Sequence, residues 1–117
     1  MVSQSIKNEI LEIIFFNTAK EQCSIFLFGS FAKGEENRTS DIDIGILPNE
    51  PIDYALIYKI KEDVNEKVNT LRMIDIVDFS RATDGLFIKE ATKEAVLWYQ
   101  GKECKVPFEN WRMQLQD

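Results

Sequence analysis

Two aspartates, one residue apart within an apolar stretch, are the part of this sequence that most directly suggests chemistry. Asp41 and Asp43 alternate with Ile42, Ile44 and Ile46. Strand side chains alternate between faces, so we expect the isoleucines to pack on a core and the aspartates to share the opposite face. Carboxylates on Cα atoms about 6.5–7 Å apart repel each other, and a hard cation such as Mg²⁺ relieves that repulsion. The pattern predicts a site for two such cations, which can hold the attacking and leaving oxygens of a phosphoryl or nucleotidyl transfer; the alternative is a solvated strand face.

A glycine–serine pair closes another apolar run upstream. Residues 24–28 are aromatic and branched, which predicts a buried strand, and Gly29 and Ser30 end it. Glycine lets the backbone approach a ligand, and the amides that follow can seat phosphate groups. The Ser30 hydroxyl could donate to a phosphate oxygen, and Lys33 could add a positive charge. The alternative is an ordinary turn in which Ser30 caps a short helix.

A third acid interrupts the apolar run 71–79, which we expect to form another strand. Asp75 falls on the face of Met73 and Val77 and opposite to Asp78. An unpaired charge in an apolar setting costs free energy, so Asp75 needs a partner or a function. Two alternatives remain: Asp75 is a strand-end acid that pairs with Arg72 or Arg38, or Asp78 is the functional acid.

Together these residues resemble the core motif of the DNA-polymerase-β-type nucleotidyltransferases. The small size resembles their minimal branch, the MntA-like proteins, and the resemblance covers roughly residues 6–101. Lys33 stands where many relatives carry arginine. The motif combines two glycines, two serines and two acids at set spacing: Gly29, Ser30, Gly34, Ser40, Asp41 and Asp43.

The resemblance implies a metal-dependent transfer of AMP from ATP to an acceptor hydroxyl, with release of pyrophosphate. For MntA-like proteins, which act as antitoxins, it implies a tyrosine hydroxyl on a HEPN-family toxin as the acceptor. Asp75 matches the third carboxylate of the family, which completes the metal site and helps to deprotonate the hydroxyl. The implied catalytic residues and ligands of two Mg²⁺ ions are Asp41, Asp43 and Asp75, and the implied nucleotide-binding residues are Gly29, Ser30 and Lys33.

Two other functions remain open. A non-catalytic antitoxin could mask its partner sterically and keep the site as a relic, although the intact set of acids argues against a decayed site. A small-molecule nucleotidyltransferase, for example one that acts on aminoglycosides, would need walls for its acceptor that this short chain does not supply. Nucleotidyltransferases usually need a second domain to hold the base and the acceptor, so a partner chain or a second copy, in a homo-oligomer, is expected to supply those walls, or the pocket is shallow and open.

Composition narrows the classes of protein further. The chain has 117 residues, 44% of them hydrophobic, and is expected to form one domain over residues 1–117. A net charge of −6 argues against an extensive nucleic-acid surface. There is no apolar run near 18 residues and no secretory signal pattern, so we expect a cytoplasmic protein without a membrane span, whose Cys23 and Cys104 are free thiols. The lack of histidine excludes histidine-based nucleophilic catalysis and histidine-ligated zinc within this sequence.

The elements that position these residues follow from hydrophobic periodicity. Helices are expected over residues 5–18, 53–68 and 85–93, the last with Leu86, Ile88 and Ala91 among its apolar positions. A short strand or helix end is expected at 96–99, and the aromatic residues that follow Pro107 could dock on the core or on a partner. Helices that alternate with strands predict an α/β or α+β fold, with a mixed central sheet, flanking helices and the nucleotidyltransferase architecture that the resemblance implies.

Overall fold

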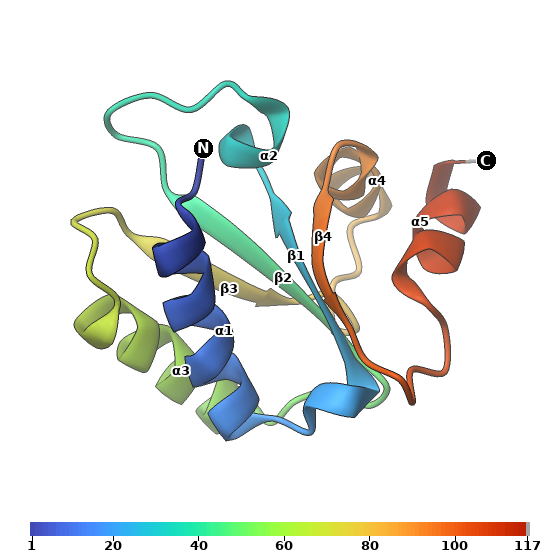
Figure 1. The fold of residues 1–117 in the computed structure, drawn as a ribbon. Helices are drawn as coiled ribbons and strands as arrows, with labels where there is room; N and C mark the ends of the chain where they lie inside the picture. The colour runs from blue at the N-terminus through green and yellow to red at the C-terminus, as the bar shows by residue number, and fades with distance from the viewer. Residues whose placement is uncertain (117) are drawn as a thin grey trace.

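The computed structural model describes residues 1–116 and contains a mixed four-stranded sheet in the order β3-β2-β1-β4 (Figure 1). This confirms the predicted fold class. The strands are β1 (Cys23–Phe28), β2 (Ile42–Pro48), β3 (Ile74–Asp78) and β4 (Val96–Gln100). The helices are α1 (Gln4–Asn17), α2 (Ser30–Lys33), α3 (Tyr54–Lys67), α4 (Gly85–Lys93) and α5 (Phe108–Gln116), with a 3₁₀ turn, η1 (Lys20–Gln22).

The pairing of the strands brings distant parts of the chain together. β1 runs antiparallel to β2 and to β4, whereas β2 and β3 are parallel because α3 crosses over between them. The register places Phe28 opposite Asp43 and places Asp43 opposite Asp75. The two acids, 32 positions apart in the sequence (75 minus 43), therefore become direct neighbours on adjacent strands.

Two helical layers cover the two faces of the sheet (Figure 1). α1 and α3 pack over one face, where the isoleucines of the strands form an aliphatic core with Ile10, Ile14, Ile60 and Val64. α4 and α5 lie on the other face, over a smaller aromatic core. The members of this second core include Phe26, Phe28, Phe79, Ala95 and Phe108.

The aspartates follow the predicted alternation. Ile42, Ile44 and Ile46 are buried in the aliphatic core, so Asp43 projects to the aromatic face, beside Phe28 on the neighbouring strand. Glycine at position 45 is required on this face, because a Cβ there would lie 2.3 Å from the ring of Phe26.

Side-chain caps explain where the main helices begin. The Ser3 hydroxyl accepts from the amide of Ile6, and the Asp53 carboxylate accepts from the amide of Ala55. Asp84 accepts from the amides of Leu86 and Phe87, which confirms the predicted start of α4. Among the described residues, no helix is both long and apolar enough to span a membrane.

Three expectations need correction or completion. The strand expected over 71–79 begins only at Ile74, and Leu71 is fully exposed because it lies in the connection that follows α3. Leu86 is 71% exposed, so α4 does not use it as a core position. The C-terminal tail docks on the core through Phe108, which is completely buried. Cys23 and Cys104 are free thiols, as predicted.

Candidate active site

Asp43 and Asp75 stand side by side on β2 and β3, and Asp41 directly precedes β2. Burial, followed by the negative charges of Asp75 and Asp41, raises the pKa of Asp43 from its ordinary value of 3.8 to about 6. The repulsion predicted from the D-x-D spacing is therefore present, and the third carboxylate contributes more to it than Asp41 does. A cation placed between these groups would remove it.

The backbone of Gly29 lies directly against the carboxylate of Asp43. Its φ angle is +75°, and a Cβ at this position would lie 2.2 Å from Asp43 Oδ2. Glycine is thus required for two reasons, the left-handed backbone and the close approach. Gly29 is also the N-cap of α2, and Ser30 is its first residue, so the alternative in which Ser30 caps the helix is wrong.

The carboxylate of Asp75 is held by two partners through one oxygen. Its Oδ1 accepts a hydrogen bond of 3.0 Å from the amide of Ile76 and lies 3.5 Å from the ammonium of Lys61 on α3. Arg72 instead donates 2.8 Å hydrogen bonds to the carbonyls of Asn37 and Ser40, and so fixes the loop that leads into β2. The expected alternative of an Asp75–Arg72 pair is therefore wrong, and Lys61 is the cation beside this acid.

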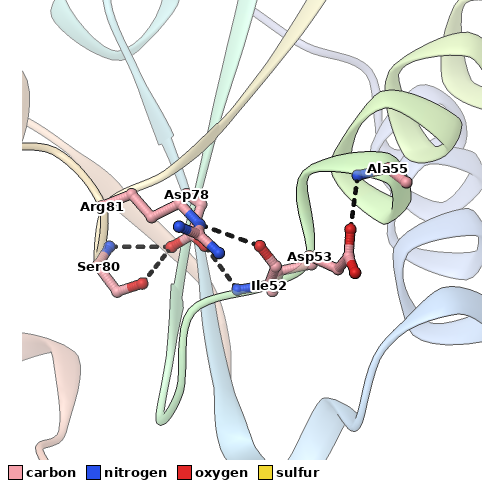
Figure 2. Close-up of polar contacts among 6 residues, drawn as sticks. All are labelled: Ile52, Asp53, Ala55, Asp78, Ser80 and Arg81. Carbon is pink, nitrogen blue, oxygen red and sulfur yellow. Dashed lines mark hydrogen bonds and ion pairs between the residues drawn. The ribbon is translucent and has the colours of Figure 1, made fainter.

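Asp78, the competing acid, has a different task. It is 7% exposed and lies on the opposite face of β3, where it accepts from the amide of Ile52 (2.9 Å) and from the amide and hydroxyl of Ser80 (2.9 and 2.6 Å). Figure 2 shows this network, in which Arg81 also contacts Asp78 and donates to the carbonyl of Ile52. Asp78 thus ties the end of β3 to the segment that enters α3, and its oxygens are already used.

A cavity of about 370 Å³ opens beside the two paired acids. It brings together four of the six predicted site residues, namely Gly29, Lys33, Asp43 and Asp75; Asp41 and Ser30 do not line it. Its remaining walls are Phe28, Val77 and the α4 residues Phe87, Glu90 and Ala91. The α4 residues were not predicted from the sequence, because nothing in their spacing indicates that this helix docks beside the acids.

The oxygen donors suit Mg²⁺, which prefers hard carboxylate ligands. Within residues 1–116, however, no group of three acids or thiols is arranged closely enough to hold a metal ion as the side chains stand. Asp75 Oδ1 faces Lys61 and the amide of Ile76. Its other oxygen has no hydrogen-bond partner among the described residues, so Asp43 and Asp75 could hold a cation, with Asp41 beside them, after a side-chain rotation.

Comparison with known proteins agrees with this geometry. The family described as "Polymerase beta, Nucleotidyltransferase" matches residues 8–103. The chain is 29% identical over 97 residues to the protein adenylyltransferase MntA of Shewanella oneidensis, which covers 83% of this chain and 68% of that protein. It is 29% identical over 105 residues to the probable protein adenylyltransferase MntA of Haemophilus influenzae, with 86% and 88% covered.

Solved structures share the fold. A toxin–antitoxin structure with AMP-PNP superposes with a TM-score of 0.74 at 23% identity, and covers 93% of this chain and 82% of that chain. The complex of a tri-AMPylated Shewanella oneidensis HEPN toxin with its MNT antitoxin gives a TM-score of 0.71 at 20% identity, with 96% and 82% covered. At these identities the likeness concerns the fold, and it matches the mixed sheet and flanking helices described above.

Proposed function

The chain belongs to the polymerase β nucleotidyltransferase family, and we propose that it transfers AMP from ATP to a tyrosine hydroxyl of a HEPN-family toxin, as an antitoxin. The names of the curated relatives and the toxin–antitoxin complexes that share the fold support this choice of reaction and partner. The observation that carries the proposal is the pairing of Asp43 with Asp75, directly against the backbone of Gly29. A solvated strand face would not need a glycine fitted to one of its carboxylates.

The proposed reaction has a simple balance of bonds. The acceptor oxygen attacks the α-phosphorus of ATP, the bond from that phosphorus to the bridging oxygen of pyrophosphate breaks, and pyrophosphate leaves with the bonding electrons. The hydroxyl proton passes to the carboxylate of Asp75, which of the three site acids is the one on the edge strand β3. Mg²⁺ held by Asp41, Asp43 and Asp75 would supply charge neutralisation at the phosphates.

The chain's own residues bind and orient the substrates. The backbone at Gly29 and Ser30 would receive the β- and γ-phosphates, and Lys33, at the same cavity, would add a positive charge. Asp43 must be ionised to act as a ligand, and its raised pKa means that proton loss accompanies metal binding at pH values near or below about 6. Catalysis on this view comes from positioning and charge neutralisation, without a covalent intermediate on the protein.

The proposal is tested with ATP labelled in its α-phosphate, Mg²⁺ and a purified HEPN-family partner. The wild-type chain should label the partner on tyrosine, and the Asp41→Asn/Asp43→Asn double variant should not. The double change Glu62→Gln/Glu66→Gln, at two exposed positions of α3, also removes two negative charges; it serves as the control and should label normally. If the double variant transfers no label but still neutralises the toxin, the result would instead support the antitoxin that masks its partner sterically.

A further inference from the structure

We propose that Phe87 and Glu90 of α4 form the binding site for the adenine base of the donor nucleotide. This inference rests on the proposed function, because it takes the triphosphate to bind at the acids and at Gly29. It assigns a role to a wall of the cavity that neither the sequence motif nor the carboxylates explain. It also provides, within the chain, a contact for the base that we expected a partner to supply.

Phe87 is a rigidly supported ring with an exposed surface in this cavity. It stacks on Phe79 with ring centroids 5.7 Å apart and an interplanar angle of 11°, and it meets Phe28 edge-on at 6.2 Å and 86°. The side chain is nevertheless 41% exposed and lines the cavity that contains Asp43 and Asp75. A ring held by two aromatic neighbours loses little freedom when a planar base stacks on it, so it is suited to bind one.

Glu90 adds a hydrogen-bond acceptor beside the ring of Phe87. It lies three residues after Phe87, on the same side of α4, and lines the same cavity. Its carboxylate has no hydrogen-bond or ion-pair partner among residues 1–116, and in its ionised form it can only accept hydrogen bonds. The amino group at C6 of adenine is a hydrogen-bond donor, which a carboxylate can accept. Glu90 therefore supplies a polar contact to the base beside the ring of Phe87.

The position of α4 relative to the other walls fixes which part of the nucleotide reaches it. Figure 1 shows α2 directly at the C-terminal end of β1 and α4 on the face of the sheet that α5 also covers, and the cavity joins residues from both helices. With the α-phosphate at Asp43 and Asp75 and the terminal phosphates toward Gly29 and Lys33, the phosphate chain occupies the α2 side. The base is left with the α4 side, whose surface is largely apolar and begins at Phe87.

The experiment separates contacts to the base from contacts to the phosphates. Binding of ATP and of inorganic tripolyphosphate, each with Mg²⁺, is measured by calorimetry on the full chain. Phe87→Leu should weaken ATP binding about tenfold, the size of one lost stacking contact, and leave tripolyphosphate binding unchanged. Phe87→Tyr, which keeps the ring, should bind ATP as the wild type does. Glu90→Ala, which removes the acceptor for the adenine amino group, should weaken ATP binding and leave tripolyphosphate binding unchanged.

Leu86→Ala is the matched control, because Leu86 precedes Phe87 on the same helix, is 71% exposed and does not line the cavity. It should leave both affinities unchanged. Equal weakening of ATP and tripolyphosphate by Phe87→Leu, or no weakening of either, would overturn the base site. A wild-type chain that binds tripolyphosphate and ATP equally would also overturn it, while label transfer to the partner could still stand. A wild-type chain that binds neither ligand and transfers no label would overturn both proposals.

Discussion

Asp43→Asn is expected to stabilise the metal-free protein while it abolishes nucleotidyl transfer. Burial and the negative charges of Asp75 and Asp41 raise the pKa of the Asp43 carboxyl from 3.8 to about 6. A group whose pKa is higher in the folded state than in the unfolded state binds more protons when folded. The contribution of Asp43 to the free energy of unfolding is then fully present below about pH 4 and is lost as the pH rises through about 6. Asp43→Asn does not lose this free energy as the pH rises, because asparagine does not ionise.

The size of the effect follows from the pKa. The rise to about 6 corresponds to at most about 3 kcal/mol, and the partial exposure of Asp43 and screening by solvent reduce this to about 1–2 kcal/mol. For a domain of 117 residues this is an increase in melting temperature of about 4–8 °C.

The assay is thermal unfolding in EDTA at pH 4 and at pH 8. Asp43→Asn should melt above the wild type at pH 8 and with it at pH 4, whereas the exposed control Glu62→Gln should match the wild type at both. Saturating Mg²⁺ should reverse the order at pH 8, because only the wild type gains binding free energy from the metal. A variant that is equally or less stable than the wild type at pH 8 in EDTA would show that the carboxylates do not repel one another in this fold.

Three other changes test separate parts of the site. Gly29→Ala places a Cβ 2.2 Å from Asp43 Oδ2 on a backbone with φ +75°, so the rate of AMP transfer should fall at least tenfold and the free energy of unfolding by about 1–3 kcal/mol. A variant with the transfer rate and melting temperature of the wild type would refute the close approach. Lys61→Met removes the ammonium 3.5 Å from Asp75 Oδ1, so Mn²⁺ should bind several-fold more tightly, most clearly at low salt. Electron paramagnetic resonance measures the bound Mn²⁺, and weaker binding would mean that Lys61 helps to bind the metal. Asp78→Asn should destabilise the protein by about 1–3 kcal/mol in urea unfolding, opposite in sign to Asp43→Asn, and a neutral result would contradict the assigned network.

Much of the site could be predicted from local patterns. The alternation in β2 placed Asp43 opposite the isoleucine face, and the glycine at position 29 marked the close turn after β1, because strand periodicity and backbone conformation are properties of a few consecutive residues. The starts of α3 and α4 lie close to the predicted ones for the same reason, and the structure shows Asp53 and Asp84 as their caps. The aspartates, the glycine and the serine also carried the family resemblance, which the match over residues 8–103 confirmed.

Other features were decided only when the chain folded. Three features join residues far apart in the sequence. They are the parallel register that sets Asp75 beside Asp43, the ion pair of Asp75 with Lys61, and the docking of α4 that brings Phe87 to the cavity. Leu86 was expected among the apolar positions of its helix, yet the helix packs so that Leu86 is exposed. Periodicity fixes which residues share a face of one element, but register and helix docking depend on how whole surfaces fit, and no short stretch of sequence contains that information.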